Sequence, residues 1–464
     1  MRDSSLPVVV IGAGPVGLAA TAHLIERGET PLVIEAGESI GQSVLNWGHV
    51  RMFSPWEYTV DSAMVRLLEK SGWEMPPLKA LPTGKDLVER FLRPFANLEI
   101  VAPYIRTSIR VTAISRQNVD KMKDRNRDEA PFIVQIECAD GSQDLLKARA
   151  IIDASGTYHN PNPLGTHGLN AIGEDTHSDH IFYGIPDILD THQERYQNQR
   201  VLVVGSGHSA INAVLELGEL QQSAPDTQII WAMRGTHLKK VYGGETNDAL
   251  PARGALGTRV RNLVEAGVVE IVSPFYLTHI ETSDDGLCVT SSENGMSVTV
   301  DELIATTGAR PNLEMLRELR LNLDSSLETT PILAPMIDPN IHSCGTVRPH
   351  GEAELRHPES NFYMIGMKSY GRAPSFLLAT GYEQARSVVA YLVGDYEAAK
   401  EVQLNLPETG VCSTDFADDE LSGGCCSTPA SETVAVGNIS IGEIPVSVGT
   451  IPVVKNGNDS SCCG

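Results

Sequence analysis

The stretch from Val8 to Glu35 constrains the fold more than any other part of this chain. It contains an apolar run over residues 8–11, a glycine-rich turn, a helical segment ending near Arg27, and a second apolar run over residues 32–34. This order is typical of a dinucleotide-binding βαβ unit. Its glycines allow a tight turn, a close approach to a pyrophosphate, and close packing of the helix on the strand. The three glycines of the GxGxxG motif are Gly12, Gly14 and Gly17.

The residue that ends the second apolar run indicates how a nucleotide would bind. It is Glu35, and a carboxylate at this position can accept hydrogen bonds from both hydroxyls of an adenosine ribose. The pyrophosphate is expected at the N-terminus of the intervening helix, where backbone N–H groups and the helix dipole favour negative charge. Strand, glycines, helix, strand and acid occur in register, which makes the pattern far more specific than GxGxxG alone.

A second unit of the same kind lies in the middle of the chain. Residues 201–204 predict its strand, and GSGHSA supplies GxGxxA before another helix. Its second strand ends in Arg234 instead of an acid. A guanidinium there can hold a ribose 2′-phosphate through paired hydrogen bonds, which favours NADPH over NADH; the alternative is an ordinary surface charge.

Two units with opposite terminal charges predict two different dinucleotides. The simplest pair is a bound FAD at the first unit and a mobile NADPH at the second, with hydride passed between their rings. Further contacts are expected where other apolar runs end on small residues, because such ends permit close approach to a cofactor. We assign Gly12, Gly14, Gly17, Glu35, Ala154, Gly156 and Gly366 to FAD, and Gly205, Gly207, Ala210, Arg234 and Gly308 to NADPH.

The order of the motifs predicts an α/β fold with two Rossmann-like domains, the second inserted in the first. Residues 1–165 are expected to form the first part of the FAD-binding domain, residues 166–312 the NADPH-binding domain, and residues 313–400 the return segment of the FAD-binding domain. Residues 401–464 are dominated by Gly, Ser, Thr and Asp, with Lys455 as their only basic residue. We expect them to form a largely disordered, Cys-containing tail.

The acidic balance of the chain excludes two classes of partner. Its 464 residues include 59 Asp and Glu against 36 Lys and Arg, which gives a formal charge of -23. Such a surface repels nucleic acid and anionic membranes, and no apolar run is long enough to span a bilayer. The first predicted strand begins within a few residues of Met1, so we expect no leader peptide and a cytoplasmic location.

Several other segments carry expectations about structure. The loop from Gly37 to Trp56 is expected either to lie over the flavin or to be a capping loop with core aromatic residues. The charged stretch over residues 120–130 is expected to be a solvated hairpin loop. Helices are expected to begin near Gly84 and near Pro374. One polar loop contains four residues that either contribute to a substrate site or lie on the surface: His342, Cys344, His350 and His357.

The motifs GAGPVGLAA, ASGTYHNPNP, GSGHSA and ATTGARP occur in this order, and over roughly residues 6–395 the chain resembles the flavin-containing monooxygenases. The fingerprint of that family between its domains, F-x-G-x-x-x-H-S-x-x-aromatic, is matched by AIGEDTHSDHI. The Gly, His and Ser agree, and His177 is either part of this function or a hinge residue hydrogen-bonded to backbone. The residues that agree are Gly173, His177 and Ser178, and those that depart from the aromatic ends are Ala171 and Ile181.

This resemblance implies a reaction in which the cofactor supplies the chemistry. NADPH would reduce FAD, O2 would add to give a flavin hydroperoxide, and a soft heteroatom (N, S or trivalent As) would attack the distal oxygen. Retained NADP+ would shield the adduct. No catalytic triad is then required, and we assign no catalytic side chain.

The placement of the eight cysteines bears on the reaction and on the substrate. No CxxC or CxxxxC pair occurs near either nucleotide motif, which argues against a dithiol–disulfide reductase core. Two adjacent pairs lie in the tail, where reduced thiols would be soft metal ligands. With this tail, the chain resembles flavoproteins encoded beside bacterial arsenic-resistance genes, which implies capture of trivalent arsenic; the alternative is that the tail cysteines are incidental or redox-buffering. The pairs are Cys425 with Cys426 and Cys462 with Cys463.

Three functions therefore remain open. The first is an NADPH-dependent FAD monooxygenase that acts on a soft heteroatom. The second is an NADPH-dependent flavoprotein reductase that passes electrons to the tail cysteines and from them to a thiol or metal partner. The third is a non-catalytic metalloid-binding flavoprotein. Oxygen consumption tied to substrate separates the first two, because only the first inserts an oxygen atom.

Overall fold

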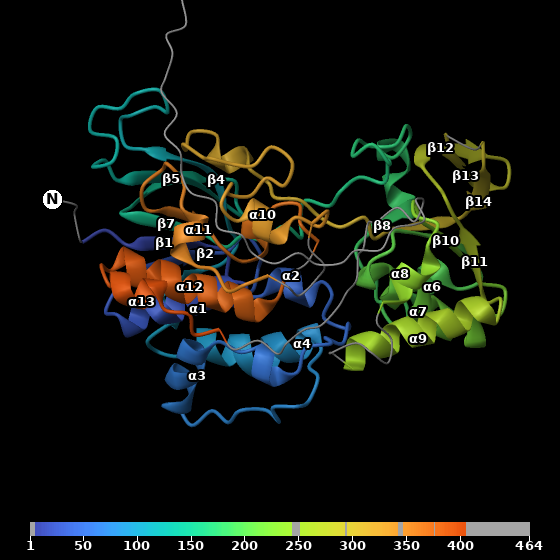
Figure 1. Ribbon diagram of the computed structural model, residues 1–464, viewed down its shortest axis with the longest axis horizontal. Coiled ribbons are helices and arrows are strands. Elements are labelled where there is room, and N and C mark those ends of the chain that lie inside the picture. The colour runs from blue at the N-terminus through green and yellow to red at the C-terminus, as the bar shows by residue number, and fades with distance from the viewer. Residues whose placement is uncertain (1–4, 244–250, 293–294, 342–346, 375, 405–464) are drawn as a thin grey trace, which may run out of the picture. The chain divides into compact units, whose positions relative to one another are not determined.

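The computed structural model describes residues 5–243, 251–292, 295–341, 347–374 and 376–404. It contains two five-stranded parallel sheets, each with helices on one face and a three-stranded antiparallel sheet on the other (Figure 1). The predicted Cys-containing tail and its four proposed metal ligands lie outside the described residues. In the part of the chain that the structure describes, no helix is long and apolar enough to cross a membrane.

The first sheet contains the first nucleotide motif. Its strand order is β16-β7-β1-β2-β3, and Val10 pairs with both Val33 and Ile152. Side chains alternate between its faces, as strand geometry requires. Val8 and Val10 pack with helices α1 and α12, whereas Val9 packs with the antiparallel sheet β4-β5-β6. The strands of the parallel sheet are β1 (Val8–Ile11), β2 (Pro31–Ile34), β3 (Ile105–Arg106), β7 (Ala150–Asp153) and β16 (Phe362–Met364).

The second sheet repeats this architecture around the second motif, in the order β11-β10-β9-β15-β8. Val201 and Val203 face helices α7 and α9, and Leu202 faces the antiparallel sheet β12-β13-β14. Its strands are β8 (Ile181–Tyr183), β9 (Arg200–Val204), β10 (Gln228–Ala232), β11 (Val269–Val272) and β15 (Glu302–Ala305). The antiparallel strands are β4 (Ile109–Arg116), β5 (Phe132–Cys138), β6 (Gln143–Ala148), β12 (Leu277–Ser283), β13 (Gly286–Ser291) and β14 (Ser297–Val300).

These sheets confirm the predicted α/β class and the two Rossmann-like units. All strands of the second sheet lie between β7 and β16 in sequence, so the second unit is inserted in the first. The exact domain boundaries stay a prediction. The α-helices are α1 (Pro15–Glu26), α2 (Gln42–Leu45), α3 (Ser62–Glu69), α4 (Gly84–Leu87), α5 (Arg93–Ala96), α6 (Gln193–Tyr196), α7 (His208–Ser223), α8 (Leu238–Tyr242), α9 (Pro251–Glu265), α10 (Ala334–Ile337), α11 (Glu352–Leu355), α12 (Leu378–Leu392) and α13 (Tyr396–Lys400).

The helix predicted near Gly84 does begin there, with a capping box between Thr83 and Asp86. It continues through a π-helical turn, η2 (Val88–Leu92), into α5. Pro94 has no N–H to donate to the carbonyl of Arg90, four residues earlier. The indole Nε1 of Trp73 donates to that carbonyl instead, at 2.9 Å. The helix predicted from Pro374 begins later than expected, at Leu378.

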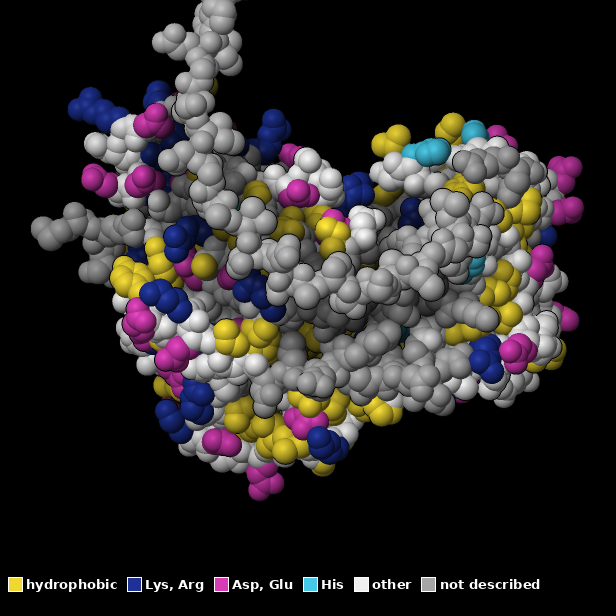
Figure 2. Space-filling view, viewed as in Figure 1, with side chains coloured by type: hydrophobic (Ala, Val, Ile, Leu, Met, Phe, Trp, Pro, Cys, Tyr) yellow, Lys and Arg dark blue, Asp and Glu magenta, His cyan; other side chains and the backbone are white. Residues whose placement is uncertain are grey.

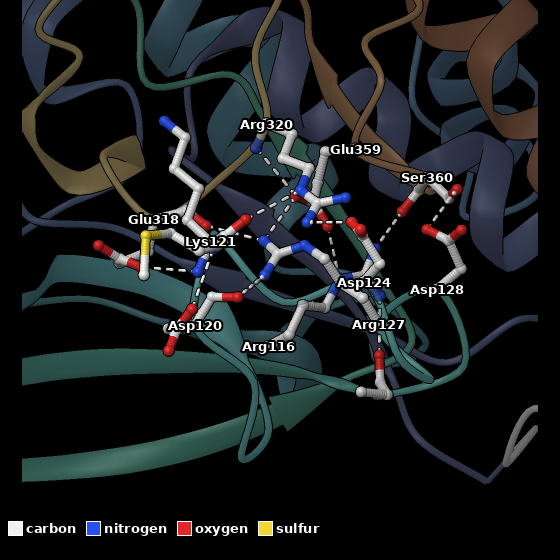
Figure 3. Close-up of polar contacts among 12 residues, drawn as sticks. Arg116, Asp120, Lys121, Asp124, Arg127, Asp128, Glu318, Arg320, Glu359 and Ser360 are labelled. Carbon is white, nitrogen blue, oxygen red and sulfur yellow. Dashed lines mark hydrogen bonds and ion pairs between the residues drawn. The ribbon is translucent and has the colours of Figure 1, made fainter.

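The charged stretch over residues 120–130 is not simply a solvated loop, and that expectation was wrong in part. Arg127 is buried and donates to Oε2 of Glu359 at 2.8 Å, while Arg116 from β4 donates to Oε1 at 2.7 Å (Figure 3). Glu359 lies just before β16, so this cluster fastens the antiparallel sheet to the return segment. This cluster is buried, whereas on the surface shown in Figure 2 acidic and basic side chains are interspersed and exposed.

Candidate functional site

The first glycine motif forms a cradle at the carboxyl end of β1. A Cβ on Gly17 would lie 2.0 Å from the carbonyl oxygen of Gly12, so the helix can pack this closely only with glycine. Gly12 has φ +98° and lies against Ala154, where a Cβ would come 2.7 Å from the carbonyl oxygen. Gly14, the N-cap of α1, has nothing within 4 Å of its Cβ position. The cradle therefore leaves open space at the helix N-terminus, which fits a pyrophosphate.

Glu35 is held against this cradle. Its Oε2 accepts from the backbone N–H of Ala13 and its Oε1 from that of Gly37, each at 2.7 Å. The carboxylate thus lies beside the glycine loop at the end of β2. A carboxylate oxygen can accept more than one hydrogen bond, so ribose hydroxyls remain compatible with this geometry.

A polar trio, formed by a buried ion pair and an exposed serine, lies next to the cradle, and sequence reasoning missed it. Lys368 Nζ donates to Oδ2 of Asp153 at 2.7 Å and to Oγ of Ser155 at 3.1 Å. Ser155 Oγ donates to the other oxygen of Asp153 at 2.7 Å. The Lys368 and Asp153 side chains are 1% and 0% exposed. The trio joins the end of β7 to the 3-10 turn η7 (Gly366–Tyr370) that follows β16.

Gly366 begins that turn and is tied to helix α12. Its N–H donates to Oε1 of Gln384 at 2.8 Å, and Nε2 of Gln384 lies 2.9 Å from Nε2 of His350. His350 is buried, and this burial lowers its pKa. His357 is also buried, and its pKa falls to about 4 for the same reason. The surface interpretation of these two histidines was therefore wrong; His342 and Cys344 lie outside the described residues.

The second glycine motif forms a similar cradle. Gly205 has φ +134°, and a Cβ there would lie 2.5 Å from the carbonyl oxygen of Thr306. Trp231 from β10 donates to the carbonyl of Gly205 at 2.7 Å and so fixes the loop. Gly207 caps α7 with nothing within 4 Å of its Cβ position, which leaves open space at that helix N-terminus.

The remaining predicted NADPH contacts lie at strand ends of the same sheet or on α7. Ala210 is buried on α7, and Arg234 is exposed just beyond β10. Gly308 follows β15 with φ +83°, next to the side chain of Asn162. Glu35 follows β2 beside the first glycine cradle, and Arg234 follows β10, the strand next to the second; their roles in cofactor binding stay predictions.

His177 has a structural role in the linking segment. Its Nδ1 lies 2.7 Å from the carbonyl oxygen of Gly173, and its Nε2 lies 3.0 Å from Oγ1 of Thr282. A Cβ on Gly173 would lie 2.0 Å from the carbonyl oxygen of Ile280, so glycine is needed for this close approach. These contacts agree with the hinge interpretation of His177.

A pocket of about 240 Å³ is lined by residues from both units. Residues of α7, which follow the second glycine motif, contribute to its wall, as do the first residues of α12. In the loop from Gly37 to Trp56, Trp56 is core, as the capping-loop interpretation expects, while Trp47 and Phe53 line the pocket; that the loop lies over the flavin stays a prediction. The lining consists of Trp47, Val50, Arg51, Met52, Phe53, Ser54, Tyr58, Thr59, Ile185, His208, Ser209, Asn212, Phe376, Leu377, Leu378 and Ala379.

A titratable pair lies near the pocket. Nε2 of His49 and Oε1 of Glu216, which is on α7, are 3.8 Å apart. Burial raises the pKa of Glu216 to about 7, with a further contribution from Asp187. Burial lowers the pKa of His49. Sequence reasoning missed both residues, since neither belongs to a motif.

One Rossmann unit is inserted in another, and each has a glycine cradle. This architecture is that of an enzyme that uses two dinucleotides. The model of the pyridine nucleotide-disulphide oxidoreductase family matches residues 9–336, more than half of the chain, and the chain belongs to this family. It is an FAD- and NAD(P)H-dependent oxidoreductase, and the open space at Gly14 and at Gly207 fits both cofactors.

The chain is similar in sequence to a curated reductase. A ferredoxin–NADP reductase of Streptococcus pyogenes is 24% identical over 227 residues, which cover 48% of this chain and 54% of the relative. The chain thus spans about half the length of the curated relatives it matches.

Solved structures show the same fold over most of the chain. Bacillithiol disulfide reductase from Bacillus cereus has a TM-score of 0.61 at 20% identity, covering 85% of this chain and 99% of its own. Ornithine N-hydroxylase from Kutzneria sp. 744 has a TM-score of 0.56 at 17% identity, and the match covers 84% of this chain and 99% of that protein. A flavin monooxygenase from Stenotrophomonas maltophilia has a TM-score of 0.53 at 20% identity, and the match covers 84% of this chain and 98% of that protein. At these identities the likeness shows the fold alone.

Proposed function

We propose that this protein is an NADPH-dependent FAD monooxygenase that transfers one oxygen atom of O2 to a soft heteroatom. The observation that carries the proposal is the pocket, whose walls are mainly apolar and aromatic and include residues next to the second glycine motif. Oxygen transfer from a reduced flavin requires that water be excluded from the reacting atoms, and such walls exclude it. The redox chemistry is supplied by FAD when it is bound.

The side chains of this chain then have binding and positioning roles. The FAD pyrophosphate is assigned to the open space at Gly14, and the adenosine ribose to Glu35. The NADPH pyrophosphate is assigned to Gly207, and Arg234 is assigned to the 2′-phosphate because its exposed guanidinium follows directly on β10. Phe53 packs against His208 with ring centroids 5.4 Å apart, so the two rings form a common part of the pocket wall.

Trivalent arsenic remains one of the soft substrates we propose, with the tail cysteines as its capture site. The attachment of the tail supports this, because the last described residues are fixed on α12. The N–H of Gln403 donates to Oε1 of Glu383 at 3.2 Å, and Arg386 donates to the carbonyl of Ala398 at 2.6 Å. From Leu378, which lines the pocket, to Arg386 the helix rises only about 12 Å. The last described residues are therefore held on the same helix whose first residues line the pocket.

The same attachment favours a second candidate, a reductase in which the tail cysteines relay electrons to a thiol or metal partner. The two functions differ in their use of O2. NADPH oxidation by the FAD-loaded protein is to be measured together with O2 uptake and peroxide release, with trivalent arsenicals, thioethers and amines as substrates. Monooxygenation predicts that one substrate raises NADPH use, lowers peroxide release and consumes one O2 per turnover.

A variant with Ser at all four positions of the tail pairs is the matched control. Oxygenation of a thioether is expected to survive in this variant, because a thioether needs no thiol carrier. The reductase function predicts that NADPH oxidation proceeds without O2 when a disulfide or a metal ion is supplied, and that the Ser variant loses this activity. That second result would replace the monooxygenase proposal.

A further inference from the structure

We propose that the pocket accepts uncharged soft-heteroatom compounds with apolar substituents, tolerates a carboxylate on them, and rejects ammonium groups. This inference rests on the proposed monooxygenase function and narrows its substrates from N, S or As to sulfides and organic arsines. It follows from the kinds of side chain that line the pocket. The same side chains predict that an amino-acid amine is a poor substrate.

The walls provide apolar surface and no negative charge. Trp47, Met52 and Phe53 form one part of the lining, and Phe376 and Leu377 another. Among the described lining residues there is neither Asp nor Glu. An ammonium group that enters such a site loses its hydration without gaining a carboxylate partner, which is strongly unfavourable. A thioether or a tertiary arsine carries no charge and loses little hydration.

Arg51 adds a positive charge to this lining. Its Nη1 donates to the carbonyl of Leu81 at 2.8 Å, and its backbone pairs with Thr83 in an isolated bridge. The guanidinium is thus anchored on one side and keeps further N–H donors. It repels an ammonium group and attracts a carboxylate, since opposite charges near a protein surface gain about 1 kcal/mol.

Neighbouring groups do not reverse this charge. Asp86 interacts with Arg51, and hydrogen bonds from the N–H and the Oγ1 of Thr83, at 2.9 and 3.0 Å, lower its pKa, so its carboxylate offsets part of the guanidinium charge. Asp86 and Glu216 lie outside the lining, and among the described lining residues Arg51 carries the permanent charge, so the lining itself favours neutral or anionic compounds.

The reaction balances with O2 as the oxidant. A sulfide R2S, O2, NADPH and H+ give R2SO, water and NADP+. One oxygen atom forms the S–O bond, and the other leaves as water with the hydride of NADPH and the proton. An arsine R3As gives R3AsO in the same way.

The experiment uses three aryl sulfides that differ only in one group: methyl phenyl sulfide, 4-(methylthio)benzoate and 4-(methylthio)benzylamine. Dimethylphenylarsine is added to test an arsenic substrate, and ornithine to test an amine substrate. Dissociation constants are measured by calorimetry on the FAD-loaded full chain, and turnover is measured as sulfoxide or arsine oxide formed per NADPH. The neutral and carboxylate sulfides are expected to bind at least about tenfold more tightly than the ammonium sulfide.

The variant Arg51→Gln tests whether Arg51 causes the difference in affinity between the carboxylate and the ammonium sulfide. The substitution is expected to raise the dissociation constant of the carboxylate sulfide by about fivefold and to leave that of the neutral sulfide unchanged. Arg93→Gln is the control, because Arg93 is paired with Glu89 at 3.1 Å and does not line the pocket. Binding without turnover would support the inference about the pocket and overturn the monooxygenase function. Oxygenation of ornithine in preference to the sulfides, or no binding of any sulfide, would overturn the inference about the pocket.

Discussion

Lys368→Met perturbs the FAD cradle without touching the groups that we assign to FAD. The substitution removes the ammonium that pairs with Asp153 at 2.7 Å and leaves a carboxylate that is fully buried. Asp153 precedes Ala154, which contacts Gly12 of the glycine loop. We therefore expect both the fold of the first unit and its affinity for FAD to suffer.

The expected loss can be estimated from the burial of the pair. Removing one partner of a buried ion pair costs about 3–5 kcal/mol, because the other charge is left without compensation. Ser155 still donates to the carboxylate, which favours the lower end of this range. The double variant Asp153→Asn with Lys368→Met removes both charges and should recover most of the loss. Lys368 is thus a positioning residue for FAD.

The assay is urea unfolding of the apoprotein, followed by titration with FAD. Lys368→Met is expected to lower the unfolding midpoint and to weaken FAD binding, and the double variant is expected to restore the midpoint. Lys400→Met is the control, because Lys400 is exposed and pairs with Glu397 at the surface. An unfolding free energy within about 1 kcal/mol of the parent for Lys368→Met, with unchanged FAD affinity, would refute this reasoning.

Three further predictions follow from the same geometry. Arg234→Gln should raise the KM for NADPH by about tenfold with little change for NADH, as steady-state kinetics would show; equal effects on both would contradict the 2′-phosphate role. Gly14→Ala should fold normally but bind FAD weakly, whereas Gly17→Ala should not fold, because its Cβ would lie 2.0 Å from a carbonyl oxygen; equal melting temperatures of these two variants would count against the packing argument. Glu216 has a pKa raised to about 7, above its unfolded value of 4.5, so its carboxyl destabilises the fold increasingly as pH rises from about 4.5 through 7. Glu216→Gln should therefore stabilise the protein at pH 8, by on the order of 2 kcal/mol, and not at pH 4, and urea unfolding at the two pH values would show whether it does.

The sequence predicted those features that depend on local patterns. The strand at Val8–Ile11, the two glycine motifs and the capping box near Gly84 each lie within a short stretch whose geometry is determined by neighbouring residues. The insertion of one unit in the other followed from the order of the motifs alone. Glu35 and Arg234 were readable because each occupies a fixed place at the end of a strand.

The features that were missed depend on contacts between distant residues. Lys368 and Asp153 are 215 positions apart, and no local sequence pattern around either residue predicts that they pair. Glu359 similarly pairs with Arg116 of β4 and with Arg127, and Arg127 lies in a stretch whose composition indicated exposure to solvent. The pocket combines side chains from several loops and helix ends, so its apolar walls became visible only in the fold. A signal was present for Trp47 and Phe53, in the aromatic loop after Glu35.

The central claim, oxygen transfer to a soft heteroatom, is tested most directly by isotopic labelling. The FAD-loaded protein is incubated with NADPH and methyl phenyl sulfide under ¹⁸O2, and the product is analysed by mass spectrometry. Our account predicts a sulfoxide that carries one ¹⁸O atom, with one NADPH consumed per product. NADPH oxidation without labelled sulfoxide, or with peroxide as its only oxygen product, would contradict it.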